Sequence, residues 1–295
     1  MKACPPFAIK DVGPMGKGLV ATRNLPKAAC VFEENSLFSS KTAKIDEKKL
    51  LHVFSKLTPE KQAEVLNLND PKGPDNDDDN NNNGEKLKRI FDENHMVISD
   101  FFSPTTYQLF VKSSMINHSC NPNSFLANTT ETAQLVTFVE VKKGEELTHN
   151  YYYHGMMVKE ISWLKYYDRQ QMIMQDYNFV CKCVSCLKGC KVDLLREQHR
   201  FLDTTIEDNK KKFKPSFALA EKKLQLGKLF DNGLLFEDFL DCFIAGRKEK
   251  YQNAEVFEKD IKFKREFKIF MKTGAFGSKY RQQLIDELGL NEPGI

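Results

Sequence analysis

The sequence predicts an α+β fold that is rich in strands at its amino-terminal end and helical at its carboxyl-terminal end. Residues 7–34 alternate short apolar runs with Gly and Pro, a pattern typical of short strands joined by tight turns. From residue 194 onward, apolar residues recur at the spacing of amphipathic helices, as in FALAEKKLQLGKLF (217–230). A chain of 295 residues is long enough for one large domain or two ordinary ones.

The segments between these two regions are predicted in chain order. Residues 42–68 predict a helix and then a second short helix that begins after Pro59. Residues 69–86 contain almost no apolar side chains, so we expect a solvated, disordered loop there. The segment SPTTYQLFVKSS (103–114) is expected to be helical. The remaining elements are expected to be strands near 123–127 and 133–141 and helix from 155 to 175.

Composition narrows the class of protein. With 41% hydrophobic and 29% charged residues the chain reads as soluble and globular, and no apolar run approaches the roughly 18 residues of a membrane span. The first residues carry two prolines and the charged Asp11, unlike a secretory signal. A net charge of +3 is too small to indicate nucleic-acid binding by itself. We therefore expect a monomer in the cytoplasm, the nucleus or both, without membrane contact.

Four thiols crowd into the stretch CKCVSCLKGC, residues 181–190. Thiolates are zinc ligands, and a structural zinc site is closed by four of them in a tetrahedron. Structural cysteines without a metal are usually isolated among apolar residues, whereas lysines, serine and glycine intervene here. The spacing therefore predicts Zn²⁺. Three ligands are expected to be Cys181, Cys183 and Cys186, and the fourth is either the local Cys190 or a distant thiol such as Cys120.

Four short motifs follow one another along the chain. They are GKGLVA (16–21), NHSCNPN (117–123), GEELTHNY (144–151) and YNFVCKCVSC (177–186). In this order, over roughly residues 7–190, they resemble the SET-domain lysine methyltransferases, and the last three resemble the SET-and-MYND subgroup most. The resemblance implies a β-rich fold in which the NHSC segment and the GEELT-to-Tyr segment form a knot-like crossing, a rare kind of threading.

The resemblance also implies an activity: transfer of a methyl group from S-adenosylmethionine to a lysine of a histone or another protein. It assigns the role of catalytic tyrosine to Tyr151 and the walls of the lysine channel to Tyr177 and Met96. In the subgroup, a cysteine at the position of Cys120 is the fourth zinc ligand. The implied cofactor-binding residues are Gly16, Lys17, Gly18, Ser114, Asn117, His118, Tyr151 and Phe179. His118 is expected to be a packed anchor and not a general base.

Domain boundaries are expected as follows. Residues 1–153 would form the SET domain, with a helical and Asn/Asp-rich insert at about 35–93. Residues 154–190 would form a zinc-binding post-SET segment, and residues 191–295 a helical region that covers one side of the substrate cleft. No cysteine lies between Cys30 and Cys120, so the MYND zinc finger of the subgroup is not expected.

Two other interpretations of the sequence remain open. Met96 stands where the subgroup has an aromatic wall, and KAA (27–29) stands where the family often has a glycine. These two departures favour a catalytically inactive SET scaffold that binds peptide or cofactor. Cofactor binding without turnover would identify it. The basic runs 210–214 and 259–268 suggest a zinc-stabilised nucleic-acid-binding protein, but no base-reading motif accompanies them. We therefore expect no direct nucleic-acid partner.

Overall fold

The predicted amino-terminal strands form the centre of the protein. The computed structural model describes residues 5–13, 15–27, 29–42, 45–71, 83–98, 105–128, 132–137, 139–154, 157–158, 161, 164–212 and 217–230. Most of the loop predicted at 69–86 and the carboxyl-terminal part from residue 231 lie outside these residues.

One sheet brings three of the four sequence motifs side by side. Its strands, in spatial order, are β1 (Phe7–Asp11), β2 (Lys17–Ala21), β10 (Glu146–His149) and β7 (Asn117–His118). The first two pairs are antiparallel, whereas β10 and β7 run parallel, with Thr148 opposite Asn117. Residues more than a hundred positions apart in sequence therefore meet on neighbouring strands.

Two further sheets of three strands and one strand pair complete the β part of the described chain. One three-stranded sheet has the order β3 (Cys30–Asn35), β9 (Thr132–Thr137), β8 (Ser124–Asn128), and the other β4 (Phe38–Ser40), β6 (Thr106–Leu109), β5 (Met96–Ile98). The pair is β11 (Tyr153–His154) with β12 (Met157–Val158). Buried side chains from several sheets, among them Leu19, Phe110, Leu135 and Leu147, form one hydrophobic cluster.

The prediction of a helix over residues 103–114 is wrong. Its middle is the strand β6, which pairs with β4 on one side and β5 on the other. Among residues 105–114, which the structure describes, helical structure is limited to the last two, as part of the 3₁₀ turn Ser113–Met115. β-Branched and aromatic residues such as Thr106 and Tyr107 favour strands, and a central strand is stabilised on both edges by partners that a local pattern does not reveal.

The helices α1 (Glu47–Ser55), α2 (Pro59–Leu66) and α3 (Asn83–Asn94) pack together at one end of the strands. Asp46 and Thr58 cap the first two by accepting hydrogen bonds from backbone N–H groups, as sequence signals predict. α3 begins at Asn83, so the tract 69–86 is not irregular to its end. Burial of apolar residues spaced along one face stabilises this start, namely Leu87, Ile90 and Phe91.

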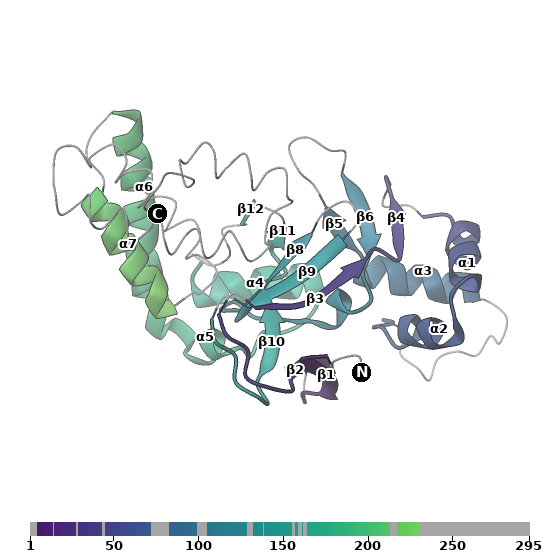
Figure 1. Ribbon diagram of the computed structural model, residues 1–295. Helices are drawn as coiled ribbons and strands as arrows, with labels where there is room; N and C mark the ends of the chain where they lie inside the picture. Colours follow the sequence, from purple (N-terminus) through teal and green to yellow (C-terminus); the bar gives the residue numbers. More distant parts are fainter. Residues whose placement is uncertain are drawn as a thin grey trace, which may run out of the picture.

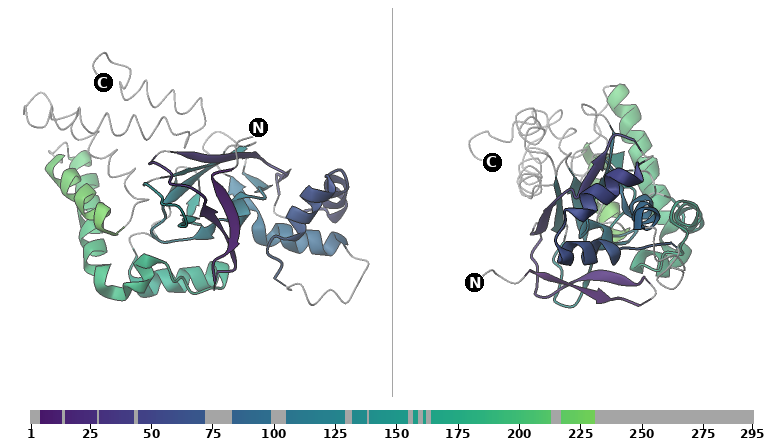
Figure 2. Two further views of the ribbon diagram at one scale, coloured as in Figure 1. Left: turned by 60° about the horizontal axis from the view of Figure 1, so that its bottom comes forward. Right: turned by 90° about the vertical axis from the view of Figure 1, so that its right-hand side faces the viewer.

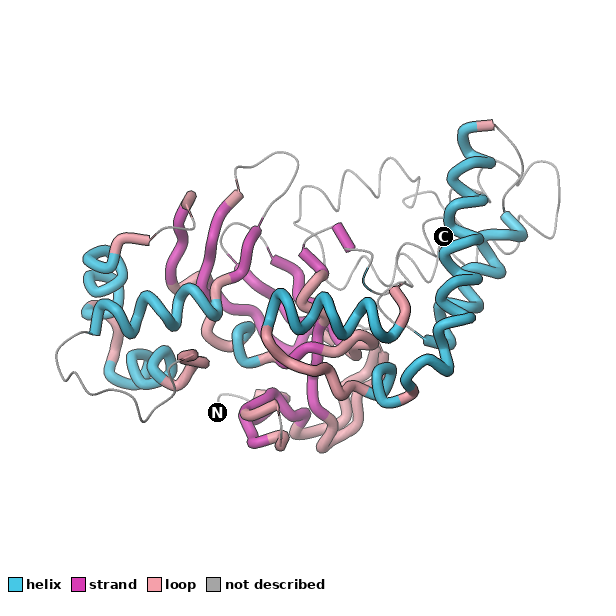
Figure 3. Tube along the Cα trace, turned by 180° about the vertical axis from the view of Figure 1, so that it is seen from behind, coloured by secondary structure: helices cyan, strands magenta, loops and turns pink. Residues whose placement is uncertain are grey.

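The other end of the described chain contains the helices α4 (Tyr166–Tyr177), α5 (Val184–Leu187), α6 (Asp193–Lys211) and α7 (Phe217–Phe230). The helix predicted from residue 155 begins only at Tyr166, because Met157–Val158 form the strand β12 and pair with β11. Figures 1 and 2 show the strands between α1–α3 at one end and the α6–α7 pair at the other. Seen from behind, α4 crosses the strands (Figure 3). None of the described helices is both long and apolar enough to span a membrane.

Candidate functional site

The NHSC motif is fastened to strand β10 by its own polar side chains. The Asn123 amide donates to the carbonyl oxygen of Glu146 at 2.7 Å and accepts from the N–H of Thr148 at 2.9 Å. The N–H of Ser119 donates to the carbonyl oxygen of His149 at 2.9 Å. These hydrogen bonds continue the parallel β7–β10 pairing beyond the two strands, so they fix residues 117–124 relative to residues 146–151.

Tyr151, the predicted catalytic residue, lies directly after this paired region. Its N–H donates to Nδ1 of His118 at 3.1 Å, and its hydroxyl donates to the carbonyl oxygen of Ile116 at 3.1 Å. Burial, reinforced by the nearby Tyr177 and Glu146, raises the pKa of Tyr151 well above its ordinary value. The group is therefore a neutral phenol at physiological pH, with its hydrogen directed at Ile116 and its oxygen able to accept a hydrogen bond.

The neighbouring Tyr152 lies in a different environment. Its side chain is buried in a hydrophobic cluster with the cysteines of the CKCVSC segment and with Ile173. The ring of Tyr177 contacts both tyrosines, with centroid distances of 5.1 Å to Tyr151 and 5.5 Å to Tyr152. The ring of His118 also contacts both tyrosines, at centroid distances of 5.2 Å from Tyr151 and 6.2 Å from Tyr152. Tyr151 contacts His149 as well, at 5.0 Å, whereas Tyr152 is buried beside the cysteines.

Two more aromatic residues reach Tyr151 from the end of α4. The helix stops at Asn178, which has left-handed dihedral angles (φ 55°, ψ 37°) and carries the chain back towards the strands. Tyr177 donates its hydroxyl to the carbonyl oxygen of Tyr151 at 3.3 Å, and burial raises the pKa of Tyr177 to about 12. The ring centroid of Phe179 lies 6.0 Å from that of His118. Tyr177 remains 37% exposed, so this aromatic group borders solvent.

The two glycines of the GKG motif act differently. Gly16 has a φ of +73°, which favours glycine in the turn between β1 and β2. Gly18 has an ordinary backbone but no room for a side chain: a Cβ atom there would lie 2.4 Å from Oε1 of Glu146 and 2.8 Å from Nδ2 of Asn117. The Asn117 amide donates to the carbonyl oxygen of Lys17 at 3.1 Å and to Oε1 of Glu146 at 2.7 Å. Residues of three motifs therefore meet at this point.

The remaining predicted site residues have other contacts. The hydroxyl of Ser114 lies within hydrogen-bonding distance of the carbonyl oxygens of Phe110 (2.7 Å) and Asn94 (3.0 Å). Met96 lies on β5 and packs against the hydrophobic cluster of the sheets, which includes Ile116. Neither observation tests a role in binding cofactor or lysine, so both roles stay predictions.

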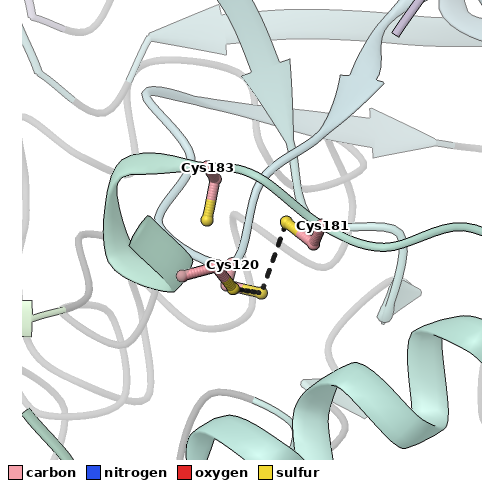
Figure 4. Close-up of side chains that lie close together, drawn as sticks. Cys120, Cys181 and Cys183 are labelled. Atoms are coloured by element: carbon pink, nitrogen blue, oxygen red, sulfur yellow. Dashed lines mark hydrogen bonds between the residues drawn. The ribbon is translucent and has the colours of Figure 1, made fainter. Parts of the chain in front are cut away.

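Four cysteines from two distant segments come together. The sulfur atoms of Cys120, Cys181, Cys183 and Cys186 all lie within 4.8 Å of one another. Cys120 Sγ is 3.9 Å from Cys181 Sγ and 3.5 Å from Cys186 Sγ, and Figure 4 shows the side chains of Cys120, Cys181 and Cys183 converging. Cys190 is exposed and is not part of this group. The fold thus brings Cys120, rather than Cys190, to the three grouped thiols.

A buried cation lies against this cysteine cluster. Arg169 is fully buried on α4, and its Nη1 donates to the carbonyl oxygen of Leu164 at 2.5 Å. Nη1 also lies 4.0 Å from Oδ1 of Asp193, and within the described part of the chain Nε and Nη2 have no nitrogen or oxygen partner. Burial opposes the charge, but the adjacent Cys120 and Cys186 raise the pKa of Arg169 above its ordinary value. A buried guanidinium needs negative charge nearby, and thiolates in the cluster would supply it together with the Asp193 carboxylate.

His118 connects the cluster to the tyrosine. It is buried, its Nδ1 accepts from the N–H of Tyr151, and its Nε2 lies 3.4 Å from Cys120 Sγ. Burial lowers the pKa of His118 to about 4, so the ring is neutral at physiological pH. Because Nδ1 accepts, the ring hydrogen is on Nε2 and faces the sulfur.

Comparison with known proteins identifies the domain. Residues 16–152 match the family model of the SET domain. The chain contains a SET domain. It is 31% identical over 78 residues to the protein-lysine N-methyltransferase SMYD4 of Homo sapiens and of Pongo abelii, and 32% identical to that of Mus musculus. Each match covers 26% of this chain and 9% of the relative, so the chain corresponds to a small part of those proteins.

Sequence reasoning gave no role to several residues that shape this SET domain. Glu146 contacts Asn117, and Arg169 faces the cysteines. Glu34 accepts hydrogen bonds from the N–H groups of Lys112 and Ser113 and thereby anchors the 3₁₀ turn that precedes the NHSC motif. A signal was available for Glu146, which belongs to the GEELT motif, whereas the contact of Glu34 depends on residues 78 positions away.

Proposed function

We propose that this SET domain transfers a methyl group from S-adenosylmethionine to the side-chain amine of a lysine in a histone or another protein. The observation that carries the proposal is the meeting of Tyr151 and the aromatic end of α4 around His118, next to the point where Asn117 contacts Glu146 and the backbone of Lys17. The similarity to relatives named as protein-lysine N-methyltransferases supports the same reaction class.

The residues near Gly18 fit the methionyl end of the cofactor. When bound, S-adenosylmethionine supplies a methyl group activated by a sulfonium. Asn117 and the backbone at Gly16–Gly18 would hold its amino-acid part, because the absence of a side chain at Gly18 lets the Asn117 amide lie close to this backbone. Phe179 would pack on the adenine, and the backbone of His118 and the Ser114 region would complete the binding surface.

Tyr151 would orient the acceptor amine. Its hydroxyl hydrogen is directed at the carbonyl oxygen of Ile116, so its oxygen is available to accept a hydrogen bond from the lysine amine. Its raised pKa argues against a tyrosinate that would remove a proton from the substrate. We infer that the tyrosine contributes alignment and electrostatic stabilisation and forms no covalent intermediate.

The acceptor lysine must lose its proton before it can be methylated, although its ordinary pKa is about 10.4. The rings of Tyr151 and Tyr177 would form apolar walls of the lysine channel, with Tyr177 at the border to solvent. Such a channel disfavours the ammonium form by removing it from water. The chain's own part in this step is therefore desolvation and orientation.

The cysteine cluster would hold one structural zinc ion. Four thiolates at about 2.3 Å from zinc lie about 3.8 Å from one another in a tetrahedron, and the observed separations of 3.5 and 3.9 Å from Cys120 Sγ fit this geometry. The buried charge of Arg169 fits an anionic metal–thiolate group. The metal would tie Cys120, and with it the crossing of the NHSC and GEELT segments, to the post-SET segment that carries the other three ligands.

The proposal is tested by incubating the protein with S-adenosylmethionine labelled in its methyl group, a panel of histones and a cell lysate. Label in a protein band, mapped by mass spectrometry to methyl-lysine, is the expected result. The Tyr151→Phe variant is the matched control, because it keeps the ring and removes the hydroxyl. Cofactor binding without label transfer to any protein would indicate the inactive scaffold instead, and absence of cofactor binding would refute both.

A further inference from the structure

The neighbours of the Asn117 side chain determine which way its amide group is turned. A primary amide has two N–H donors, and both nearby partners of Nδ2 are acceptors, namely the carbonyl oxygen of Lys17 and a carboxylate oxygen of Glu146. Neither partner can donate to the amide oxygen when the carboxylate is ionised. The nitrogen of the amide therefore faces Glu146 and Lys17, and Oδ1 is the atom left for a ligand.

Glu146 is itself held in place. Its backbone belongs to β10, where it pairs with Val20 of β2, and its carbonyl oxygen accepts from the Asn123 amide. Its side chain is half-buried against the backbone of Gly18, at a distance that only a glycine permits. The backbone of Glu146 is thereby fixed, and its carboxylate lies within hydrogen-bonding distance of the Asn117 amide.

These contacts define what the site accepts. An amide oxygen accepts a hydrogen bond, and the acceptor 2.7 Å from the amide nitrogen polarises the amide so that its oxygen accepts more strongly. A donor that is also a cation forms the strongest hydrogen bond to such an oxygen. The α-ammonium of an amino acid has these two properties.

We propose that Glu146 is a positioning residue for cofactor binding: it holds the Asn117 amide so that Oδ1 accepts a hydrogen bond from the α-ammonium of S-adenosylmethionine. This inference rests on the proposed function, because it concerns the same cofactor. It adds a residue that acts through Asn117, and it predicts that the effect of Glu146 is confined to the amino-acid end of the ligand.

The test measures dissociation constants by calorimetry for three ligands: S-adenosylmethionine, S-adenosylhomocysteine and 5′-methylthioadenosine, which lacks the amino-acid end. Glu146→Ala is expected to weaken the first two about tenfold, as for loss of a hydrogen bond to a charged group, and to leave the third unchanged. Glu146→Gln keeps an oxygen that accepts from Asn117, so it should recover most of the loss. Glu145→Gln, a change at the adjacent exposed glutamate, is the matched control and should bind all three like wild type.

A double-mutant cycle with Asn117→Ala decides whether Glu146 acts through Asn117. In the Asn117→Ala background, Glu146→Ala is expected to cause no further loss. A loss of the same size in both backgrounds would overturn the inference, because Glu146 would then act on the ligand independently. Equal weakening of 5′-methylthioadenosine, or unchanged affinity of Glu146→Ala for S-adenosylmethionine, would also overturn it. Failure of the wild-type protein to bind S-adenosylmethionine would refute the proposed function as well.

Discussion

Replacing Cys120 by serine tests whether the proposed zinc site includes this residue or is formed only by the cysteines of residues 181–190. Cys120 lies 61 residues before Cys181 and 66 before Cys186, whereas the other three thiols lie within six residues of one another. A metal that includes Cys120 therefore closes a loop of about 60 residues. For a loop of that size the chain-entropy relation gives about 4 kcal/mol of stabilisation of the folded state.

The expected result follows from this magnitude. Cys120→Ser should lose bound zinc and lower the free energy of unfolding by about 4 kcal/mol, which for a domain of 150–250 residues corresponds to a melting temperature lower by about 8–16 °C. Zinc is measured per chain by elemental analysis, and unfolding by calorimetry with and without a chelator. Cys190→Ser is the control, since Cys190 is exposed and outside the group, and it should match wild type in both assays.

Two outcomes would refute this reasoning. If Cys120→Ser keeps one zinc per chain and the wild-type melting temperature, the metal does not join the two segments. If Cys190→Ser loses the metal and Cys120→Ser does not, the four ligands are local and the proximity of Cys120 is incidental. A wild-type protein whose stability a chelator leaves unchanged would argue against any structural metal, because metal binding and folding are coupled in such sites.

The remaining predictions concern Tyr151. Tyr151→Phe should bind S-adenosylmethionine within a few-fold of wild type, but its rate of methyl transfer should fall by orders of magnitude. Tyr152→Phe changes a residue of the hydrophobic cluster that contains the cysteines, and it should stay active. Single-turnover rates of the two variants compare them directly. The pKa of Tyr151 is raised, so its phenol stays protonated as pH rises. The transfer rate should therefore not fall between pH 8 and roughly pH 10, where an ordinary tyrosine begins to ionise, and a falling rate in that range, with the fold intact by circular dichroism, would contradict the buried neutral phenol.

Local sequence patterns predicted the elements that depend on local signals. The Gly- and Pro-punctuated strands of residues 7–34 and the capped helices α1 and α2 are present in the structure. β6 was not predictable in this way, because its partners β4 and β5 come from segments on either side of the helical insert. The pairing of a central strand is decided by those partners, and a run of four residues is too short to reveal them.

The candidate site shows the same difference between features that local sequence patterns predict and features that depend on tertiary contacts. Spacing alone grouped Cys181, Cys183 and Cys186, but it left Cys120 and Cys190 as alternatives for the fourth position. The fold resolves the geometry, since it places Cys120, which follows the strand β7 paired with β10, within 4.8 Å of the three grouped thiols. The contact of Glu146 with Asn117 likewise requires that two strands be in register, and no pattern within either motif encodes that register.

The order of residues within the NHSC motif has a physical reason in this register. Along an extended segment, alternate side chains point to opposite sides. Asn117 thus faces Gly18 and Glu146, while His118 and Cys120, two residues apart, face the tyrosines and the cysteine cluster. His118 accepts from the N–H of Tyr151 on one nitrogen and meets Cys120 Sγ with the other. The position of Tyr151 is thereby tied to the thiol cluster through the ring of His118, so we expect a disturbance of the cluster to reach Tyr151 through these two contacts.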